Sequence, residues 1–146
     1  MKIERIDLYY FALPVIKDQS DGSQDSFIVR VRTDTGLEGY GESDSSPLLA
    51  LAAYTLPMSH SNLVNLSEIL IGRRLDSPDD VRAAHAHAKR RALDMAQFPH
   101  AYAAADIALW DVLGKHLNQP TYRLLGHDQN LPKRACLLYH IHLCSA

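Results

Sequence analysis

The sequence predicts an α+β domain, in which a three-stranded antiparallel meander is followed by a helical bundle. Two observations support this class. Apolar residues alternate with a period of about two in separate stretches of the first 42 residues, and from about residue 61 they recur at helical spacing. Because the strands come first and the helices follow, the order indicates α+β rather than alternating βαβ units.

Three segments near the start of the chain are expected to be strands. Residues 2–13 carry apolar side chains at roughly alternate positions and end at Pro14. Alternation resumes over residues 27–32 and again over residues 37–42. Gly36 lies between these two segments and can adopt the positive φ that a tight turn needs. We therefore expect a hairpin that the first strand completes as a meander.

Three helices are expected in the second part of the chain. The first covers about residues 61–72 and stops at a glycine. The second begins at Ser77, which is followed by a proline and two aspartates, and runs to about residue 96. The third covers residues 99–117, with Asn118 as a left-handed C-cap.

Composition excludes several classes of protein. The chain has 146 residues, of which 47% are hydrophobic and 22% charged, as in an ordinary single globular domain. Fifteen basic residues against 17 acidic ones give a net charge of -2, so there is no global basic field for nucleic acid or an anionic membrane. Without a long apolar run or a secretory leader, we expect a cytoplasmic protein that binds neither nucleic acid nor membrane.

The histidines and cysteines do not form a recognisable metal site. His85 and His87 lie two positions apart in an expected helix, on different faces, and most of the other histidines are isolated. An extended tail would place Cys136, His140, His142 and Cys144 on one side. Four ligands along one strand would spread over more than about 20 Å, so at best two neighbours could join other ligands.

The charged motifs do not form a catalytic site either. Asp106 and Asp111 lie five positions apart on one helix and do not face each other as an acid pair would. The basic run of residues 89–91 is most simply a solvated helix face, with anion binding as the less favoured alternative. We therefore assign no catalytic residue and no metal ligand to this chain.

Three blocks of sequence carry a resemblance to a known family. They are residues 29–42 (VRVRTDTGLEGYGE), residues 57–72 (PMSHS followed by SEILIG) and residues 105–126 (ADIALWDVLGK followed by P and LLG). Together they resemble the N-terminal capping domain of the enolase superfamily, in its mandelate racemase and muconate lactonizing enzyme branch. The resemblance implies a capping domain over residues 1–126 and a linker or aberrant tail over residues 127–146.

In that family the capping domain closes over the mouth of a (β/α) barrel, and two mobile segments shape substrate specificity. Here these segments correspond to residues 15–26, which are largely polar, and to residues 43–60. They would exclude water and contact the distal end of a carboxylate substrate. The resemblance thus implies Lys17, Tyr54, Met58 and His60 as substrate contacts. For Tyr54 and Met58 the alternative is packing between cap and barrel.

The family's chemistry belongs to the barrel, where a Lys or His base abstracts the proton α to a carboxylate. Mg²⁺ held by three acidic residues stabilises the enediolate. After Gly126 only residues 127–146 remain, whereas a barrel takes about 200 residues or more. We therefore expect neither the base nor the Mg²⁺ ligands in this chain. A frameshift, a premature stop or a truncated gene model would produce such an end.

Two functions remain open at this point. The first is a truncated capping domain of a Mg²⁺-dependent enzyme, either an acid-sugar dehydratase or a racemase, which is inactive without its barrel partner. The second is a stand-alone binding or oligomerisation module. In that case the surface that would have packed on the barrel mediates assembly, for example as a homo-oligomer.

Overall fold

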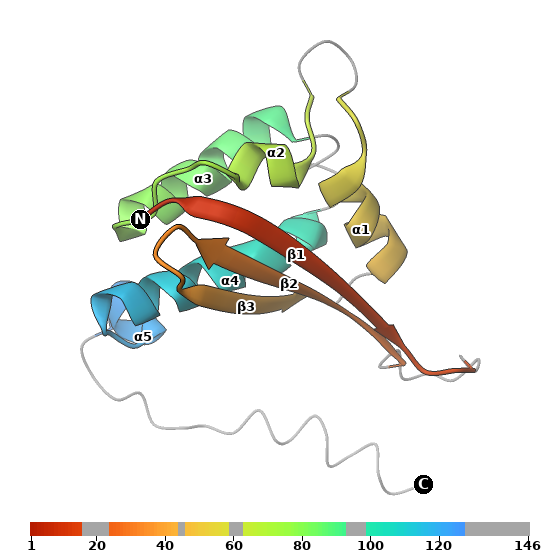
Figure 1. The fold of residues 1–146 in the computed structure, drawn as a ribbon, viewed down its shortest axis with the longest axis horizontal. Helices are drawn as coiled ribbons and strands as arrows, with labels where there is room; N and C mark the ends of the chain where they lie inside the picture. The colour runs from red at the N-terminus through yellow and green to blue at the C-terminus, as the bar shows by residue number, and fades with distance from the viewer. Residues whose placement is uncertain (16–23, 44–45, 59–62, 93–98, 128–146) are drawn as a thin grey trace, which may run out of the picture.

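The computed structural model describes residues 1–15, 24–43, 46–58, 63–92 and 99–127. The predicted meander is confirmed: β1 (Ile3–Ala12), β2 (Asp25–Thr33) and β3 (Glu38–Ser43) form an antiparallel sheet in the order β1-β2-β3 (Figure 1). Val29 pairs with Leu8 on one side and with Gly41 on the other. Gly36 has φ 83° in the turn between β2 and β3, as predicted.

The helices follow the sheet along the chain. They are α1 (Pro47–Thr55), α2 (Leu66–Leu70), α3 (Pro78–Arg91), α4 (Pro99–Leu117) and α5 (Thr121–Leu124). Figure 1 shows α4 running behind the sheet, where it contacts β2 and β3, while α3 packs against both α2 and α4. Within the described residues, no helix is both long enough and apolar enough to cross a bilayer.

The core lies between the sheet and α4. Phe27, Val29 and Val31, which alternate along β2, are fully buried on the face that meets the helices. Leu109 and Leu113, one turn apart on α4, are also fully buried. The predicted period-two and helical patterns therefore point their apolar residues into one shared core.

The opposite face of the sheet is polar and held by ion pairs. The Asp7 carboxylate, only 9% exposed, accepts two hydrogen bonds from Arg30 at 2.8 and 3.0 Å and another from Arg5. Burial acts to raise the pKa of Asp7, but the hydrogen bonds from Arg30 and Arg5 hold it below its usual range. This face is solvated, so the meander buries one side only.

Strand β3 meets α4 with backbone against backbone. A Cβ atom added to Gly41 would lie 2.0 Å from the carbonyl oxygen of Ala104, and one added to Gly39 would lie 2.2 Å from that of Ala108. No side chain fits at such distances, so glycine is required at both positions for the close approach. The last two of the three glycines in the GLEGYG sequence therefore let a helix pack closely against a strand.

The outer edge of β3 is closed by side chains of α4. Asp111 accepts a hydrogen bond of 2.9 Å from the backbone N–H of Tyr40, and Lys115 donates one of 2.8 Å to the carbonyl of Glu38. Asp111 and Lys115 also pair with each other at 2.8 Å. Because an open strand edge is a template for pairing with another chain, these two residues protect the sheet from edge-to-edge association.

The predicted helix signals at Ser77 and Asn118 are confirmed. The Ser77 hydroxyl accepts from the N–H of Asp80, and the Asp80 carboxylate accepts in return from the N–H of Ser77 at 2.9 Å, which completes a capping box. Asn118 ends α4 with φ 51°. Local sequence signals therefore fix these helix ends.

Other helix boundaries differ from the prediction. Helix α2 starts at Leu66 rather than near residue 61, because the Asn65 side chain caps it by accepting from the N–H of Glu68 at 2.9 Å. Val64 is extended instead and forms a bridge with Ala92. That bridge also ends α3 at Arg91, before the predicted end near residue 96.

Two helices were not predicted at all. Residues 43–60 were expected to be a mobile segment, but α1 occupies its middle. The sequence PLLALAAYT is apolar on every side, so it shows no helical periodicity from which a helix could be predicted. Helix α5 is a single turn that begins directly after Pro120.

Candidate functional site

Most of the exposed large apolar side chains among the described residues lie in two segments of the chain. The end of β1 and the residues that follow it provide one group, and α1 with the residues after it provides the other. Helix α1 contacts both β1 and β2. Figure 1 shows α1 on the same side of the molecule as the end of the sheet where β1 finishes and β2 begins. We call this set the apolar rim: Phe11, Leu13, Val15, Leu48, Leu49, Leu56 and Met58, each between 44% and 67% exposed.

The part of the rim beside the end of β1 contains a shallow hollow of about 240 Å³. The backbone N–H of Leu13 donates to the carbonyl of Gln24 at 2.9 Å, which extends the pairing of β1 and β2 beyond the strands themselves. Phe11 and Leu13 line the hollow together with Asp25 and Ser26. An apolar floor beside a carboxylate and a hydroxyl can accept a ligand of mixed polarity.

Helix α1 presents its apolar residues in two directions. Ala50, Ala53 and Tyr54 are buried against the domain, whereas Leu48 and Leu49 point outward and are 60% and 52% exposed. A helix that is apolar all round is normally buried on all sides. The outward residues of α1 therefore lack the covering surface that such a helix usually has.

Tyr54 anchors α1 from inside the domain. Its hydroxyl donates to the carbonyl of Ala101 in the first turn of α4 at 2.7 Å, and its ring packs against Phe27 with centroids 5.6 Å apart. Burial raises the pKa of this hydroxyl, which keeps it protonated as a donor. Ser43 donates to the adjacent carbonyl, that of His100, at 2.6 Å. The first turn of α4 therefore holds both ends of the 43–54 stretch.

The residues after α1 are held by Asn65. Its amide nitrogen donates to the carbonyl of Leu56 at 2.8 Å, while its oxygen caps α2. A buried amide that uses both its donor and its acceptor in this way orders the chain on either side of it. Met58 lies two residues beyond Leu56 and remains 62% exposed.

The four predicted substrate contacts have different placements. Tyr54 is 1% exposed and lies in the core, so it supports α1 by packing within the domain and does not line a surface. Met58 is exposed on the rim. Lys17 and His60 lie outside the described residues. Ser43 was not proposed at all, although the alternation of small residues Gly39, Gly41 and Ser43 marks the face of β3 that meets α4.

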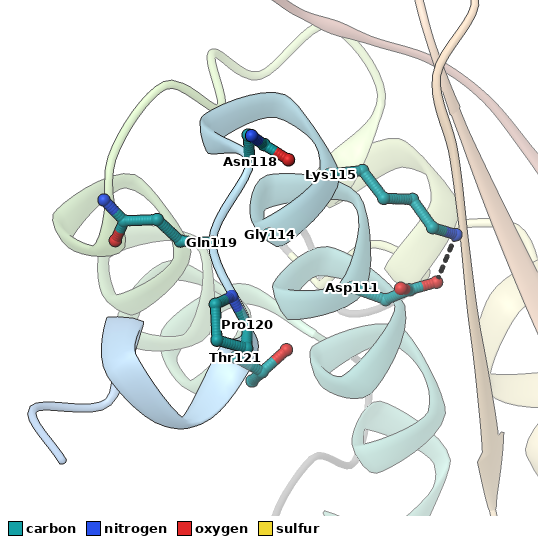
Figure 2. Close-up of a pocket in the computed structure, with 7 residues that line it drawn as sticks. All are labelled: Asp111, Gly114, Lys115, Asn118, Gln119, Pro120 and Thr121. Carbon is teal, nitrogen blue, oxygen red and sulfur yellow. Dashed lines mark hydrogen bonds and ion pairs between the residues drawn. The ribbon is translucent and has the colours of Figure 1, made fainter. Parts of the chain in front are cut away.

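A second hollow, of about 350 Å³, lies where α4 ends and α5 begins (Figure 2). Several of its polar groups are already engaged: Asp111 binds Tyr40 and Lys115, and Gln119 donates its backbone N–H to the carbonyl of Gly114 at 2.9 Å. The rise of α4 from Ala101 to Leu117 places this end about 24 Å from the anchor of Tyr54. We interpret it as a structural joint. It is lined by Asp111, Gly114, Lys115, Asn118, Gln119, Pro120 and Thr121.

The described residues do not fit a metal ion. Among them no three His, Cys, Asp or Glu side chains come together in a group that could hold one. Asp106 and Asp111 make separate contacts: Asp111 binds at the β3 edge, and Asp106 lies between α3 and α4. The tail residues 136–144 lie outside the described part of the chain. We therefore assign no chemical step through Mg²⁺ to these residues.

Comparison with known proteins identifies the family. Residues 14–126 match the family described as mandelate racemase/muconate lactonizing enzyme, N-terminal domain. The chain is 36% identical over 135 residues to a cis-3-hydroxy-L-proline dehydratase of Roseibium aggregatum, covering 86% of this chain and 34% of that protein. It is 34% identical over 131 residues to an N-succinyl-L-Arg/Lys racemase of Bacillus cereus, with the same coverage of 86% and 34%.

A solved structure agrees with these sequence matches. The fold superimposes on a predicted mandelate racemase from Rhodobacter sphaeroides with a TM-score of 0.82 and 39% identity, covering 87% of this chain and 32% of that one. The chain thus spans about a third of the length of its relatives. It belongs to the mandelate racemase/muconate lactonizing enzyme family of the enolase superfamily, of which it carries the N-terminal capping domain.

Proposed function

We propose that this chain is the capping domain of a Mg²⁺-dependent enolase-superfamily enzyme, an acid-sugar dehydratase or a racemase. In this proposal residues 1–126 form the cap. The cap closes the active site and shapes its specificity, and it has no catalytic activity alone. The observation that carries the proposal is the apolar rim.

The rim favours a missing partner surface. Seven large apolar side chains are concentrated in two short segments, whereas single exposed apolar residues scattered over a surface would need no explanation. Covering apolar surface stabilises an association by roughly 25 cal/mol per Å² before the costs of binding. A barrel domain that packs on α1 and on the end of β1 would cover this surface.

The same surface supports a role in specificity. Met58 has a flexible thioether side chain that can adapt to different ligand shapes, and it is exposed at the end of an anchored helix. We propose Met58, Lys17 and His60 as contacts to the distal end of a carboxylate substrate. Tyr54 would act as a positioning residue, because it fixes α1 to α4 through the hydroxyl bond to Ala101.

The reaction class rests on the relatives and on the sequence resemblance. The relatives are a dehydratase and a racemase, and both lie within one family. The segment of residues 57–72 favours sugar-acid dehydration. When bound in the barrel, Mg²⁺ would stabilise the enediolate formed by loss of the proton α to the carboxylate. This chain would contribute closure and exclusion of water.

Activity assays test the proposal. The purified 146-residue protein should show no Mg²⁺-dependent turnover of acid sugars above the chemical background. Residues 1–126 should restore turnover when they replace the cap of the cis-3-hydroxy-L-proline dehydratase, and Met58→Ala in that chimera should change KM more than kcat. Turnover that follows the short protein through purification would refute the proposed inactivity.

A stand-alone binding or assembly module is the second candidate, and the apolar rim favours it too. In that case a second copy or another protein covers the rim, and no barrel is required. Size-exclusion chromatography with light scattering distinguishes the two. A concentration-independent monomer argues against assembly, whereas a dimer that Leu49→Ser dissociates supports it.

A further inference from the structure

A third hollow, of about 380 Å³, lies between α3 and α4 and shares no residue with the apolar rim. Helix α3 is well fixed at this point, because its residues Val81, Ala84 and Ala88 are buried against the domain. We call the hollow the α3–α4 groove. It is lined by Val81, Arg82, His85 and Lys89 from α3 and by Asp106 and Trp110 from α4, among others.

The α3 side of the groove presents two cations. Arg82 and Lys89 are seven positions apart, which places them two turns apart on one helix face. Arg82 pairs at 2.8 Å with Asp79, whose side chain is 89% exposed, so the pair is weak and open to exchange. Within the described part of the chain, Lys89 has no hydrogen bond or ion pair. Both cations are therefore available to an anion.

The α4 side supplies an aromatic wall. The guanidinium carbon of Arg82 lies 6.0 Å from the centre of the Trp110 ring, a distance at which a cation is attracted to the ring face. The partly buried indole and the neighbouring Val81 give the groove apolar surface. His85 stands edge-on to Tyr102 with ring centroids 5.0 Å apart and an angle of 80°, which fixes the imidazole against this wall.

One acidic group, Asp106, lines the groove, and its charge affects which ligands the groove can bind. The Asp106 carboxyl is partly buried, and burial raises its pKa although His85 and a hydrogen bond from Trp110 act against the shift. In its charged form Asp106 repels an anion. Among the residues that line the groove, two permanent cations face this one carboxyl, and Asp79, which pairs with Arg82, lies outside the lining. An anion that takes the place of Asp79 on Arg82 is therefore favoured over a cation.

We infer that the α3–α4 groove binds a small organic carboxylate with an apolar body. Arg82 and Lys89 hold the carboxylate, and the body packs on Trp110. This assigns a role to one member of the basic run of residues 89–91, because Lys89 lines the groove while Arg90 does not. The inference does not depend on the proposed capping function.

A single reporter makes the test direct. Trp110 is the only tryptophan in the sequence, so its indole N–H gives one resonance in a ¹H–¹⁵N spectrum of the 146-residue protein. Titration with benzoate should shift this resonance to saturation, with a dissociation constant of about 1–10 mM for so small a ligand. Benzamide has the same shape without the charge and should bind at least about threefold more weakly.

Three variants test which charged residues contribute to benzoate binding. Lys89→Gln should weaken benzoate binding about two- to fivefold, as expected for one exposed charge pair. Arg90→Gln removes the next charge of the same run and should leave binding unchanged. Asp106→Asn should strengthen binding, because it removes the opposing charge. Equal effects of Lys89→Gln and Arg90→Gln, equal binding of benzamide and benzoate, or no shift of the indole would each overturn the inference.

Discussion

The β3–α4 contact and the apolar rim are opposite kinds of surface in one small domain. At the contact, Gly39 and Gly41 let two backbones touch. Asp111 and Lys115 form hydrogen bonds with backbone groups on the outer edge of the strand. At the rim, Leu48 and Met58 are about 60% exposed although they are apolar. The domain therefore has a closed surface at the β3–α4 contact and an uncovered apolar surface at the rim.

The largest expected effect is at the closed contact. Gly41→Val places a branched side chain where a Cβ alone would lie 2.0 Å from the carbonyl of Ala104. We expect a loss of about 3 kcal/mol or more in the free energy of unfolding, or no folding. Leu48→Val is the control on the rim and should change it by less than about 0.5 kcal/mol. Urea denaturation measures both, and equal stabilities would show that the close approach is dispensable.

Two buried tyrosines differ in whether their hydroxyl groups are hydrogen-bonded. Tyr54 donates its hydroxyl to Ala101, whereas the Tyr102 hydroxyl is the only buried side-chain nitrogen or oxygen of the described residues without a hydrogen-bond partner. Tyr54→Phe should cost about 1–2 kcal/mol because it leaves α1 without its anchor, and Tyr102→Phe should be neutral or stabilising. Denaturation midpoints of the matched pair test this, and hydrogen exchange should rise in α1 for Tyr54→Phe alone.

The start of α3 should show acid dependence. The backbone N–H of Asp76 lowers the pKa of Asp80, and Ser77 adds to the shift against the opposing effect of burial. Because the folded pKa lies below the unfolded value of about 3.9, the stabilisation is present above that pH and is lost as the pH falls through the folded pKa.

Asp80→Asn should therefore destabilise the protein by about 0.5–1 kcal/mol at pH 7, and the difference from the wild type should vanish at strongly acidic pH. Thermal unfolding between pH 2 and pH 7 measures this. Asp79→Asn is the matched control, since that side chain is 89% exposed and among the described residues pairs only with Arg82. A constant effect of Asp80→Asn across this range would contradict the linkage.

The smallest effect on stability is expected on the rim. Leu49→Ser removes an apolar side chain that is 52% exposed, so the free energy of unfolding should change by less than about 0.5 kcal/mol. Binding of a hydrophobic dye and self-association should both fall, because the rim loses apolar area. A large loss of stability would show that Leu49 belongs to the core.

Much of the fold could be predicted because its signals are local. Alternation in β2, the turn at Gly36, the proline after Ser77 and the cap at Asn118 each depend on a few neighbouring residues. Helix α1 could not be predicted from its own sequence, because it has no polar face and depends on Tyr54 reaching α4. Tertiary contacts decide such segments.

The candidate site was predicted less completely, for the same reason. The family resemblance points to residues 43–60, where Met58 is exposed, and its contact with substrate stays a prediction. The sequence does not indicate which residues of an apolar helix face inward, so the burial of Tyr54 within the domain could not be predicted. The pairing of Arg82 with Trp110 across two helices likewise follows from packing alone.

The two glycines of β3 also determine the alignment of the strand along its neighbours. A shift of one residue would turn Tyr40 toward α4, at a place where even a single carbon atom collides with the helix backbone. A steric clash with the backbone of α4 therefore prevents this strand from shifting its register. This restriction is independent of which apolar residues the strand buries. Insertions or deletions of one residue within β3 should accordingly be far less tolerated than substitutions on its exposed positions.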